Sequence, residues 1–269
     1  TLFTTGQLKK AEKWYLRLLE GMEHSLIYNQ LSNICRHTGR LGEAIEYREK
    51  ALELAADNGQ YRANLGTLYI AAGQLRKGVD IIRQAVEASP QQAELHSCLL
   101  MNMHYLPNLD PEVLAGEHVR FGSIHAPYER DIDTHRNQPD EQRQLRIGYV
   151  SPDFRTHSVM YFFEPILDNH DRSRFEVFGY GSLSKVDGLT EELKGKFDHY
   201  RNIGVVDDEQ AADMIERDGI DILIDLAGHT AGNRLGILAR KPAPIQVSFL
   251  GYPDTTGMKQ VDYRITDIH

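Results

Sequence analysis

One short phrase recurs along the amino-terminal part of the chain. Gly-Gln-Leu stands at residues 6–8 and 73–75 and Gly-Arg-Leu at 39–41, so successive copies begin 33 and 34 residues apart. A period of this length is typical of solenoids made of paired helices, in which each repeat buries its apolar face only against its neighbours. The period predicts an array of helical hairpins before residue 90, and it constrains the fold more than composition does.

The copy that ends at Pro90 carries further positions of the same pattern. Leu65 and Tyr69 fall where a first helix contacts its partner, and Ala85 supplies a small residue where two helices approach. With its helix–turn–helix period, this segment resembles the tetratricopeptide repeat. The first copy keeps only its second helix, which predicts an array cut short on its amino-terminal side.

Stacked repeats of this kind form a concave surface suited to an extended peptide. Gln30 and Asn64 occupy equivalent positions in two first helices. Side-chain amides at such positions can bind a peptide backbone, because each offers both donors and an acceptor. Two hypotheses stay open for these residues: they bind peptide, or they are polar residues that only face solvent.

Helical patterns continue after Pro90 without a clean repeat. Asp110 as an N-cap and Pro111 at the first helical position predict the start of a helix that runs to about residue 125. Residues 127–144 are rich in Pro, Asp, Arg, Asn and Gln, which is typical of a linker. We therefore predict a helical domain over residues 1–138 and a second domain over residues 139–269.

Composition narrows the class of protein. The 269 residues carry a formal net charge of −9, which argues against broad attraction to nucleic acid. The only two cysteines, Cys35 and Cys98, lie in apolar helical contexts, so a disulfide framework is not indicated and a reducing cytoplasm is the predicted location. No signal peptide or bilayer-spanning run is recognisable. The start at Thr1 indicates a piece of a longer protein.

Residues 139–269 alternate strand and helix patterns. This alternation predicts a parallel sheet with helices on both faces, so the expected fold class is α plus α/β: helical repeats followed by a Rossmann-like lobe. The predicted strands are Leu145–Val150, Phe175–Tyr180, Ile220–Leu226, Ile245–Leu250 and Tyr263–Thr266, and the predicted helices are Tyr161–His170, Leu189–His199, Ala211–Arg217 and Asn233–Ala239.

Several common signatures are missing from the sequence. There is no Gly-x-Gly-x-x-Gly after the first predicted strand and no Walker loop, so nicotinamide and ATP sites are not indicated. His96, His104, His118 and His125 do not share a metal-ligand spacing. They are interpreted as scattered surface or interface histidines, and no metal site is predicted.

Polar residues recur at the same end of three predicted strands. Asp153 and His157 follow the first strand, Asp225 ends the strand at Ile220–Leu226, and Gly251 begins a Gly- and Thr-rich loop after Ile245–Leu250. The carboxyl ends of parallel strands meet at one edge, where open α/β sheets bind ligands. The three loops should therefore converge on one site.

These segments also carry a family resemblance. The stretches are Leu-Arg-Ile-Gly-Tyr-Val-Ser-Pro-Asp-Phe at 145–154 with His157, Asp-Gly-Ile-Asp-Ile-Leu-Ile-Asp-Leu-Ala-Gly-His-Thr at 218–230, Arg-Lys-Pro-Ala-Pro-Ile-Gln at 240–246, and Leu-Gly-Tyr-Pro-Asp-Thr-Thr-Gly at 250–257. Together with the preceding repeats, they resemble the O-GlcNAc transferase (SPINDLY-like) glycosyltransferases.

The resemblance implies the amino-terminal half of a two-lobed GT-B enzyme that moves a sugar from a UDP- or GDP-linked donor, UDP-GlcNAc being the expected one, to Ser or Thr of proteins. It implies inversion at the sugar, a protein or peptide acceptor, and no cofactor or required metal. The carboxyl-terminal lobe is not matched, so the chain alone is not expected to turn over.

Inverting transfer to a hydroxyl needs a group that takes the acceptor proton, and histidine suits this role because its unperturbed pKa lies near neutrality. His157 matches the family histidine proposed as base, although a role in positioning the acceptor or sugar is equally consistent. Asp153 is interpreted as orienting His157 or, with slight preference, as capping the next helix. Asp225 is predicted to be a buried site carboxylate and, with His157, a catalytic residue.

The resemblance also implies substrate-contacting positions around the pocket. Thr230 matches a position near the donor sugar, and the 250–253 segment matches a pocket wall, although Gly and Pro would form a tight turn there in any case. Met160 is interpreted as a core residue in preference to a sugar contact. The predicted substrate-binding set is Asp153, Met160, His229, Thr230, Leu250, Gly251, Tyr252 and Pro253.

Two alternatives to protein O-glycosyl transfer stay open at this point. One is a non-catalytic scaffold, in which the repeats recruit partners and the sheet domain has lost its activity. The other is a related glycosyltransferase that acts on asparagine or on another acceptor.

Overall fold

The computed structural model describes residues 7–126, 135–138, 140, 142–183 and 185–267. The chain forms two compact units that divide between Asp110 and Pro111. Within the described residues, no helix has the length and apolar character needed to cross a bilayer.

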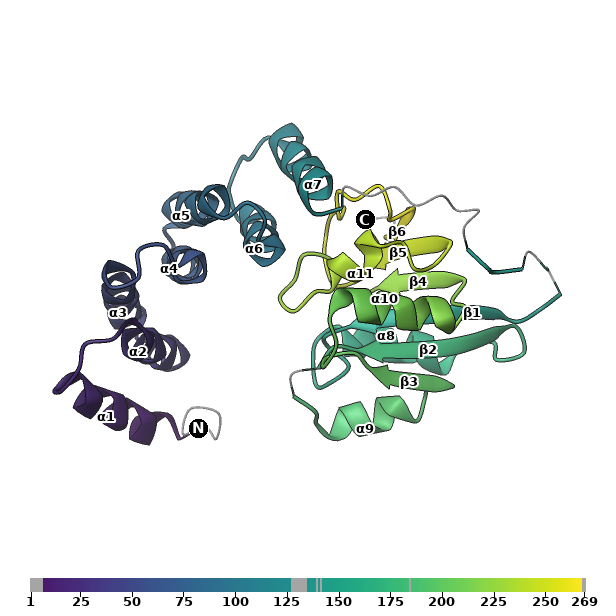
Figure 1. Ribbon diagram of the computed structural model, residues 1–269, viewed down its shortest axis with the longest axis horizontal. Helices are drawn as coiled ribbons and strands as arrows, with labels where there is room; N and C mark the ends of the chain where they lie inside the picture. Colours follow the sequence, from purple (N-terminus) through teal and green to yellow (C-terminus); the bar gives the residue numbers. More distant parts are fainter. Residues whose placement is uncertain (1–6, 127–134, 139, 141, 184, 268–269) are drawn as a thin grey trace. The chain divides into compact units, whose positions relative to one another are not determined.

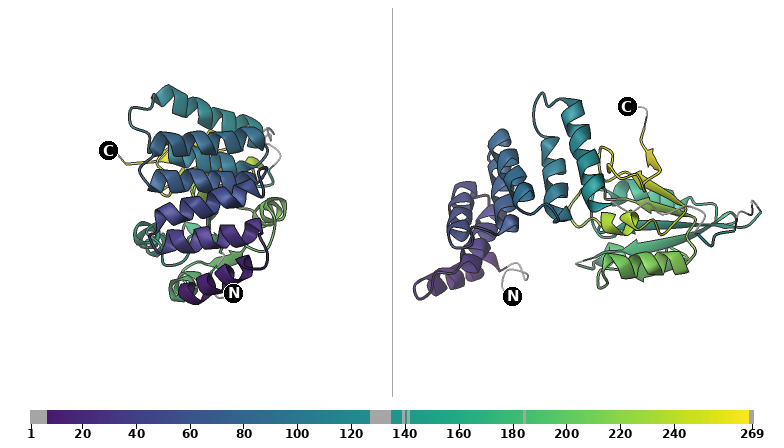
Figure 2. Two further views of the ribbon diagram at one scale, coloured as in Figure 1. Left: turned by 90° about the vertical axis from the view of Figure 1, so that its left-hand side faces the viewer. Right: turned by 45° about the horizontal axis from the view of Figure 1, so that its top comes forward.

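The first unit is a stack of antiparallel helices, as the 34-residue period predicts. The left view of Figure 2 shows the helices between Leu8 and Ala88 lying one above another in chain order. Their bounds are α1 Leu8–Leu19, α2 Ser25–His37, α3 Leu41–Glu53, α4 Gly59–Ala71, α5 Leu75–Ala88 and α6 Ala93–Met103.

Small residues allow the paired helices to approach closely. Gly66 of α4 faces Gly78 of α5, and a Cβ added to Gly66 would lie 2.5 Å from the carbonyl oxygen of Gly78. Ala44 and Ala85, at second-helix contact positions, are both fully buried. Each repeat thus packs through its small side chains, because larger ones would force the helix pairs apart.

The helix α7, Pro111–His125, begins at the predicted proline but belongs to the second unit. The predicted boundary between residues 138 and 139 therefore differs from the division of the structure. The reason is packing: Phe121 and His118 of α7 are buried against residues far along the chain, including Tyr252. Helical periodicity alone cannot show which unit a helix packs against.

The second unit is built on a six-stranded, wholly parallel sheet with the order β3-β2-β1-β4-β5-β6 (Figure 1). This is the doubly wound, Rossmann-like arrangement that the alternating pattern predicts. The strands are β1 Leu145–Ser151, β2 Phe175–Gly181, β3 His199–Asn202, β4 Ile222–Asp225, β5 Ile245–Phe249 and β6 Tyr263–Ile265.

Helices cover the sheet on both faces: α8 (Met160–Asp168) lies behind it in Figure 1, and α10 (Asp208–Arg217) lies in front. The core on the α8 side joins apolar residues of α8 and α9 (Gly188–Lys194) to those of the central strands. The short helix α11, Leu235–Ala239, packs beside α10.

One strand was missed by the sequence pattern. The helix predicted at Leu189–His199 ends at Lys194, and His199–Asn202 forms the edge strand β3. Its side chains are polar and none is fully buried, so they carry no hydrophobic alternation. The ladder to β2 holds this edge strand, and the ring of Tyr200 packs from it against the core.

The predicted linker at 127–144 lies partly outside the described residues. Its described part is bonded to the sheet unit: His135 Nε2 lies 2.8 Å from the carbonyl oxygen of Lys241, and Asn137 Nδ2 donates to Asp221 at 2.7 Å. Arg143 forms an ion pair with the same carboxylate at 2.6 Å. Polar composition alone does not distinguish a free linker from a segment bonded by its polar groups.

Candidate functional site

The carboxyl ends of all six strands meet at one edge of the sheet, as the parallel register requires. The chain passes from β1 to β2 on one side, whereas β4 lies on the other side of β1. This reversal is the topological switch point, where open α/β sheets bind their ligands. The loops after β1 and β4 flank it and carry His157 and His229.

The loop after β1 presents His157 beside a carboxylate. The imidazole is 34% exposed, and its Nδ1 lies 3.7 Å from Oδ2 of the buried Asp153. The other oxygen of that carboxylate accepts a hydrogen bond from Arg155 at 3.0 Å. In the described part of the chain, the structure places no partner on His157 Nε2. This nitrogen is therefore the one available to a substrate.

The same geometry corrects the preferred interpretation of Asp153 as a helix cap. The helix α8 begins after Val159, and among the described residues no side chain caps it. The carboxylate of Asp153 faces Arg155 and His157 instead. The carboxylate lies 3.7 Å from Nδ1, beyond hydrogen-bond distance. The amide nitrogen of Val159 donates to Nδ1 at 3.4 Å, which places the proton of the neutral ring on Nε2.

Asp225 is buried and hydrogen-bonded, as predicted, but it faces the backbone of its own loop. The two carboxylate oxygens accept from the amide nitrogens of Ala227 at 3.2 Å and of Gly228 at 2.6 Å. Burial raises the pKa of this carboxyl to about 6, although both hydrogen bonds act in the opposite direction. Because the side chain is fully buried, this geometry supports shaping of the loop rather than contact with substrate.

His229 is also buried, with 1% of its surface exposed. Its Nε2 lies 3.0 Å from the carbonyl oxygen of Thr256, and its ring packs edge-on against Phe121 and Tyr252. The imidazole therefore links the loop after β4 to α7 and to the loop after β5. This position differs from the predicted substrate contact.

The helix α7 closes over these two loops. His118, fully buried, places Nε2 2.8 Å from the hydroxyl of Tyr252, while its Nδ1 lies 2.9 Å from the carbonyl oxygen of Leu114. Gly122 meets Gly257 so closely that a Cβ at either position would overlap backbone of the other segment. Burial is the main cause that raises the pKa of the Tyr252 phenol.

The loop after β5 forms a tight turn. Such a turn is compatible with a role of the 250–253 segment as a wall of the pocket. Leu250 adopts a positive φ of 74°, and Gly251 packs against the carbonyl of Leu226 with no room for a side chain. Pro253 is exposed at the tip. Thr230, half-buried, closes a turn of its own by donating to the carbonyl of Ala227 at 2.8 Å.

The remaining predicted contact residues are Met160, Gln30 and Asn64. Met160 is 1% exposed and lies in the hydrophobic core, in agreement with the preferred interpretation of this residue rather than with a substrate contact. Gln30 and Asn64 lie in the helical unit, at the same position of the equally long helices α2 and α4. Both are partly exposed, and Asn64 accepts a hydrogen bond from Gln60 at 3.1 Å.

The sequence reasoning missed His118 and Asp187, which contact the site loops. His118 was interpreted only as one of several scattered histidines, and no spacing links it to Tyr252. Asp187 begins a helix with a visible capping signature, Asp-Gly-Leu-Thr at 187–190. That signature predicts the cap, but it does not predict the contact that Asp187 makes with the loop of His157.

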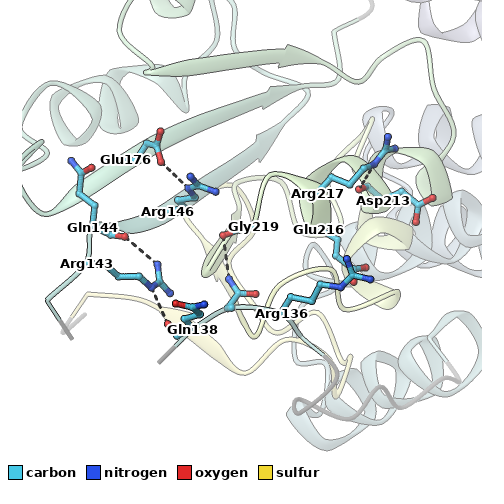
Figure 3. Close-up of a pocket in the computed structure, with 11 residues that line it drawn as sticks. Arg136, Gln138, Arg143, Gln144, Arg146, Glu176, Asp213, Glu216, Arg217 and Gly219 are labelled. Carbon is cyan, nitrogen blue, oxygen red and sulfur yellow. Dashed lines mark hydrogen bonds and ion pairs between the residues drawn. The ribbon is translucent and has the colours of Figure 1, made fainter. Parts of the chain in front are cut away.

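A cavity of about 800 Å³ lies at the opposite, amino-terminal edge of the sheet. Figure 3 shows its charged lining, where Arg146 pairs with Glu176 and the nearby Arg143 approaches the same opening. Arg143 is itself bound to Asp221. Arg143 and Arg146 therefore already have anionic partners.

Comparison with known proteins identifies relatives of both units. Residues 119–269 match the family described as Glycosyl transferase family 41, and residues 37–99 match a tetratricopeptide repeat family. A probable UDP-N-acetylglucosamine–peptide N-acetylglucosaminyltransferase SPINDLY of Petunia hybrida is 40% identical over 172 residues, covering 62% of this chain and 18% of that protein.

Two further relatives extend the comparison. A UDP-N-acetylglucosamine–peptide N-acetylglucosaminyltransferase of Caenorhabditis elegans is 45% identical over 128 residues, covering 46% of this chain and 11% of that protein. The solved structure of a mutant O-GlcNAc transferase of Thermobaculum terrenum superposes with a TM-score of 0.89 at 33% identity. The match covers 100% of this chain and 52% of that one.

Proposed function

The chain belongs to glycosyl transferase family 41, and we propose on that basis that it forms part of an inverting protein O-glycosyltransferase. The helical unit receives a polypeptide acceptor, and the sheet unit carries one wall of the catalytic site. The chain corresponds to about half the length of the solved transferase it matches. The donor is a nucleotide sugar, with UDP-GlcNAc as the first candidate, because the names of the relatives specify it.

The observation that carries the proposal is the pairing of His157 with Asp153 at the switch point. An exposed imidazole with Nδ1 near a buried carboxylate presents Nε2 outward. Transfer to a hydroxyl requires removal of its proton as the oxygen attacks the sugar, and a positioned imidazole contributes typically 10²- to 10⁴-fold to such a step. His157 either holds the hydroxyl in line for attack or takes this proton in the tautomer that carries its hydrogen on Nδ1.

The backbone of the two neighbouring loops supports the donor side of the site. Gly228 and Gly251 lack side chains where their loops pack against each other and against β4. Asp225 holds the first of these loops through two amide hydrogen bonds. Preorganised loops of this kind favour catalysis because they do not need to reorganise when charge develops on the leaving diphosphate. We infer that a second lobe supplies the remaining nucleotide contacts and that the 269-residue chain alone does not turn over.

The test uses the complete polypeptide. It is incubated with an acceptor protein extract and with UDP-GlcNAc, another UDP-hexose or a GDP-hexose in separate reactions, and the products are measured by intact-protein and fragment mass spectrometry. We expect a sugar on Ser or Thr from one donor, and we expect His157→Ala to reduce its rate of formation. Absence of any sugar with every donor would instead favour a non-catalytic scaffold.

The same measurement separates the acceptor classes. Sugar that alkaline β-elimination removes is attached to Ser or Thr, whereas sugar that resists elimination and maps to asparagine indicates the related enzyme class. The 269-residue chain serves as a further control, since it is expected to give no product.

A further inference from the structure

The loop that carries His157 has little internal structure. Between β1 and α8, the amide nitrogen of Arg155 donates to the carbonyl of Asp153 at 2.6 Å, and that of Met160 donates to the carbonyl of His157 at 3.1 Å. Thr156, which directly precedes His157, is exposed. Phe154 anchors the first half of the loop in the core. The more exposed stretch around His157 is held by local turns, so a contact from outside the loop can set its position.

That external contact comes from Asp187, which follows β2. One carboxylate oxygen, Oδ2, accepts a hydrogen bond from the amide nitrogen of Thr156 at 2.8 Å. The other, Oδ1, accepts from the amide nitrogen of Thr190 at 3.0 Å and thereby caps α9. These bonds, with the Thr156 amide as the largest contribution, lower the pKa of the Asp187 carboxyl below its usual range.

The amino-terminal end of α9, which Asp187 caps, is anchored by buried residues. Thr190 and Leu193 are both fully buried, and Leu193 belongs to the main core of the sheet unit. The Thr190 hydroxyl completes a capping box with Asp187. Since β1 and β2 are adjacent in the sheet, their loops lie side by side, and one carboxylate can bond to both.

We propose that Asp187 is a positioning residue that sets the place of His157 by binding the backbone of the residue before it. A carboxylate can satisfy both the loop and the helix at once because it has two acceptor oxygens, and charge-assisted hydrogen bonds of this type are stronger than neutral ones. The catalytic consequence rests on the proposed function: displacement of a catalytic group by about 1 Å can cost on the order of 100-fold in rate.

The decisive variant is Asp187→Ser in the complete polypeptide. Serine is as good an N-cap as aspartate, so α9 keeps its cap. Its single, shorter hydroxyl cannot bond Thr190 and Thr156 together. A matched control is Asp207→Ser, because Asp207 caps α10 through Gln210 in the same kind of capping box. This control changes an N-cap at the same edge of the sheet without a bond to the His157 loop.

The first readout does not depend on activity. Hydrogen–deuterium exchange of a peptide that spans Thr156 is expected to accelerate about tenfold in Asp187→Ser and to stay at the wild-type rate in Asp207→Ser. The rate at which diethylpyrocarbonate modifies His157 should also change only in Asp187→Ser. Unchanged exchange and unchanged modification would overturn the proposal.

The second readout is kinetic. We expect kcat to fall about 10- to 100-fold in Asp187→Ser while KM for the donor changes less than about threefold, the pattern of a lost transition-state contribution. Equal kcat in the two serine variants would show that Asp187 serves only as a cap. If the wild-type enzyme transfers no sugar, the proposed function fails, and exchange together with His157 modification still decides whether Asp187 positions the loop.

Discussion

The loops after β1 and β4 carry the two histidines that the sequence placed at the site, but they use them in opposite ways. His157 is a third exposed, with Asp153 near its Nδ1. His229 is 1% exposed and lies beneath α7, bonded to the backbone of the loop after β5. Both follow parallel strands at the same edge. The difference comes from the element that packs over each loop.

This contrast separates two ways in which an imidazole can serve a site. An accessible imidazole can exchange a proton with a ligand, whereas a buried one holds loops together through its ring and its hydrogen bonds. Position at a strand end therefore predicts nearness to the site, but it does not predict contact with the substrate.

The largest expected effect comes from removing the accessible imidazole. His157→Ala in the complete enzyme should lower kcat by about 10- to 10,000-fold, the range spanned by positioning and general-base contributions. Initial rates of sugar transfer measure it. His199→Ala is the control, since His199 is an exposed histidine of the edge strand β3 that pairs with Glu176. Activity equal to that of the control would remove His157 from the mechanism.

Removal of the buried imidazole should act mainly on stability. His229→Ala leaves a cavity between Phe121 and Tyr252 and removes the bond to Thr256. We expect the free energy of unfolding to fall by about 2–4 kcal/mol, typical of a large truncation in a packed interior. Urea unfolding measures the loss. A rate per folded molecule that falls as far as in His157→Ala would mean that the two loops share one catalytic role.

Asp225, which lies where the loop after β4 begins, gives the stability of the fold a dependence on pH. The pKa of Asp225 is about 6 in the folded chain against an ordinary value of 3.8. Between pH 4 and pH 6, the unfolded chain loses this proton before the folded chain does, so the contribution of Asp225 to stability falls as pH rises. Well above pH 6, the carboxyl is ionised in both states, and its full destabilising contribution persists.

Asp225→Asn lacks this ionisation. The difference in unfolding free energy between wild type and variant should therefore shift against the wild type by about 2–3 kcal/mol from pH 4 to pH 6. Denaturant titrations at closely spaced pH values measure the shift. A constant difference across this range would show that the carboxyl ionises in the fold as readily as in water.

The smallest expected effect concerns the contact between α7 and the loop after β5. Tyr252→Phe removes the hydroxyl that lies 2.8 Å from His118 and keeps the ring packing. We expect a loss of about 1–2 kcal/mol, because the buried imidazole nitrogen of His118 is left without that hydroxyl. Thermal unfolding measures it. Stability equal to the wild type would indicate that packing alone holds α7 in place.

Much of the architecture could be predicted from local pattern. The helical repeats followed from the recurring glycine phrase, and the parallel sheet followed from apolar runs that alternate with helices. The place of His157 after the first strand followed from the break at Pro152. These features depend on residues close together in sequence, where periodicity and backbone restriction act directly.

The remainder of the site depends on contacts across long stretches of chain. Met160 has the two alternatives of core and substrate contact, and it lies in the core, because a helix that begins at the site must also bury one face. Asp153 was expected to cap that helix, yet its carboxylate turns to Arg155 and His157. In both cases, the sequence offered two satisfactory environments, and packing selected one.

The sequence by itself determined the repeat array, the parallel sheet and the edge at which its loops gather, because helical and strand periods and proline breaks are local properties. Only the tertiary structure decided that α7 packs against the loops after β4 and β5, that it buries His229, and that Asp187 reaches Thr156. Burial and long-range hydrogen bonds depend on which surfaces meet, and no periodicity in the chain encodes that meeting.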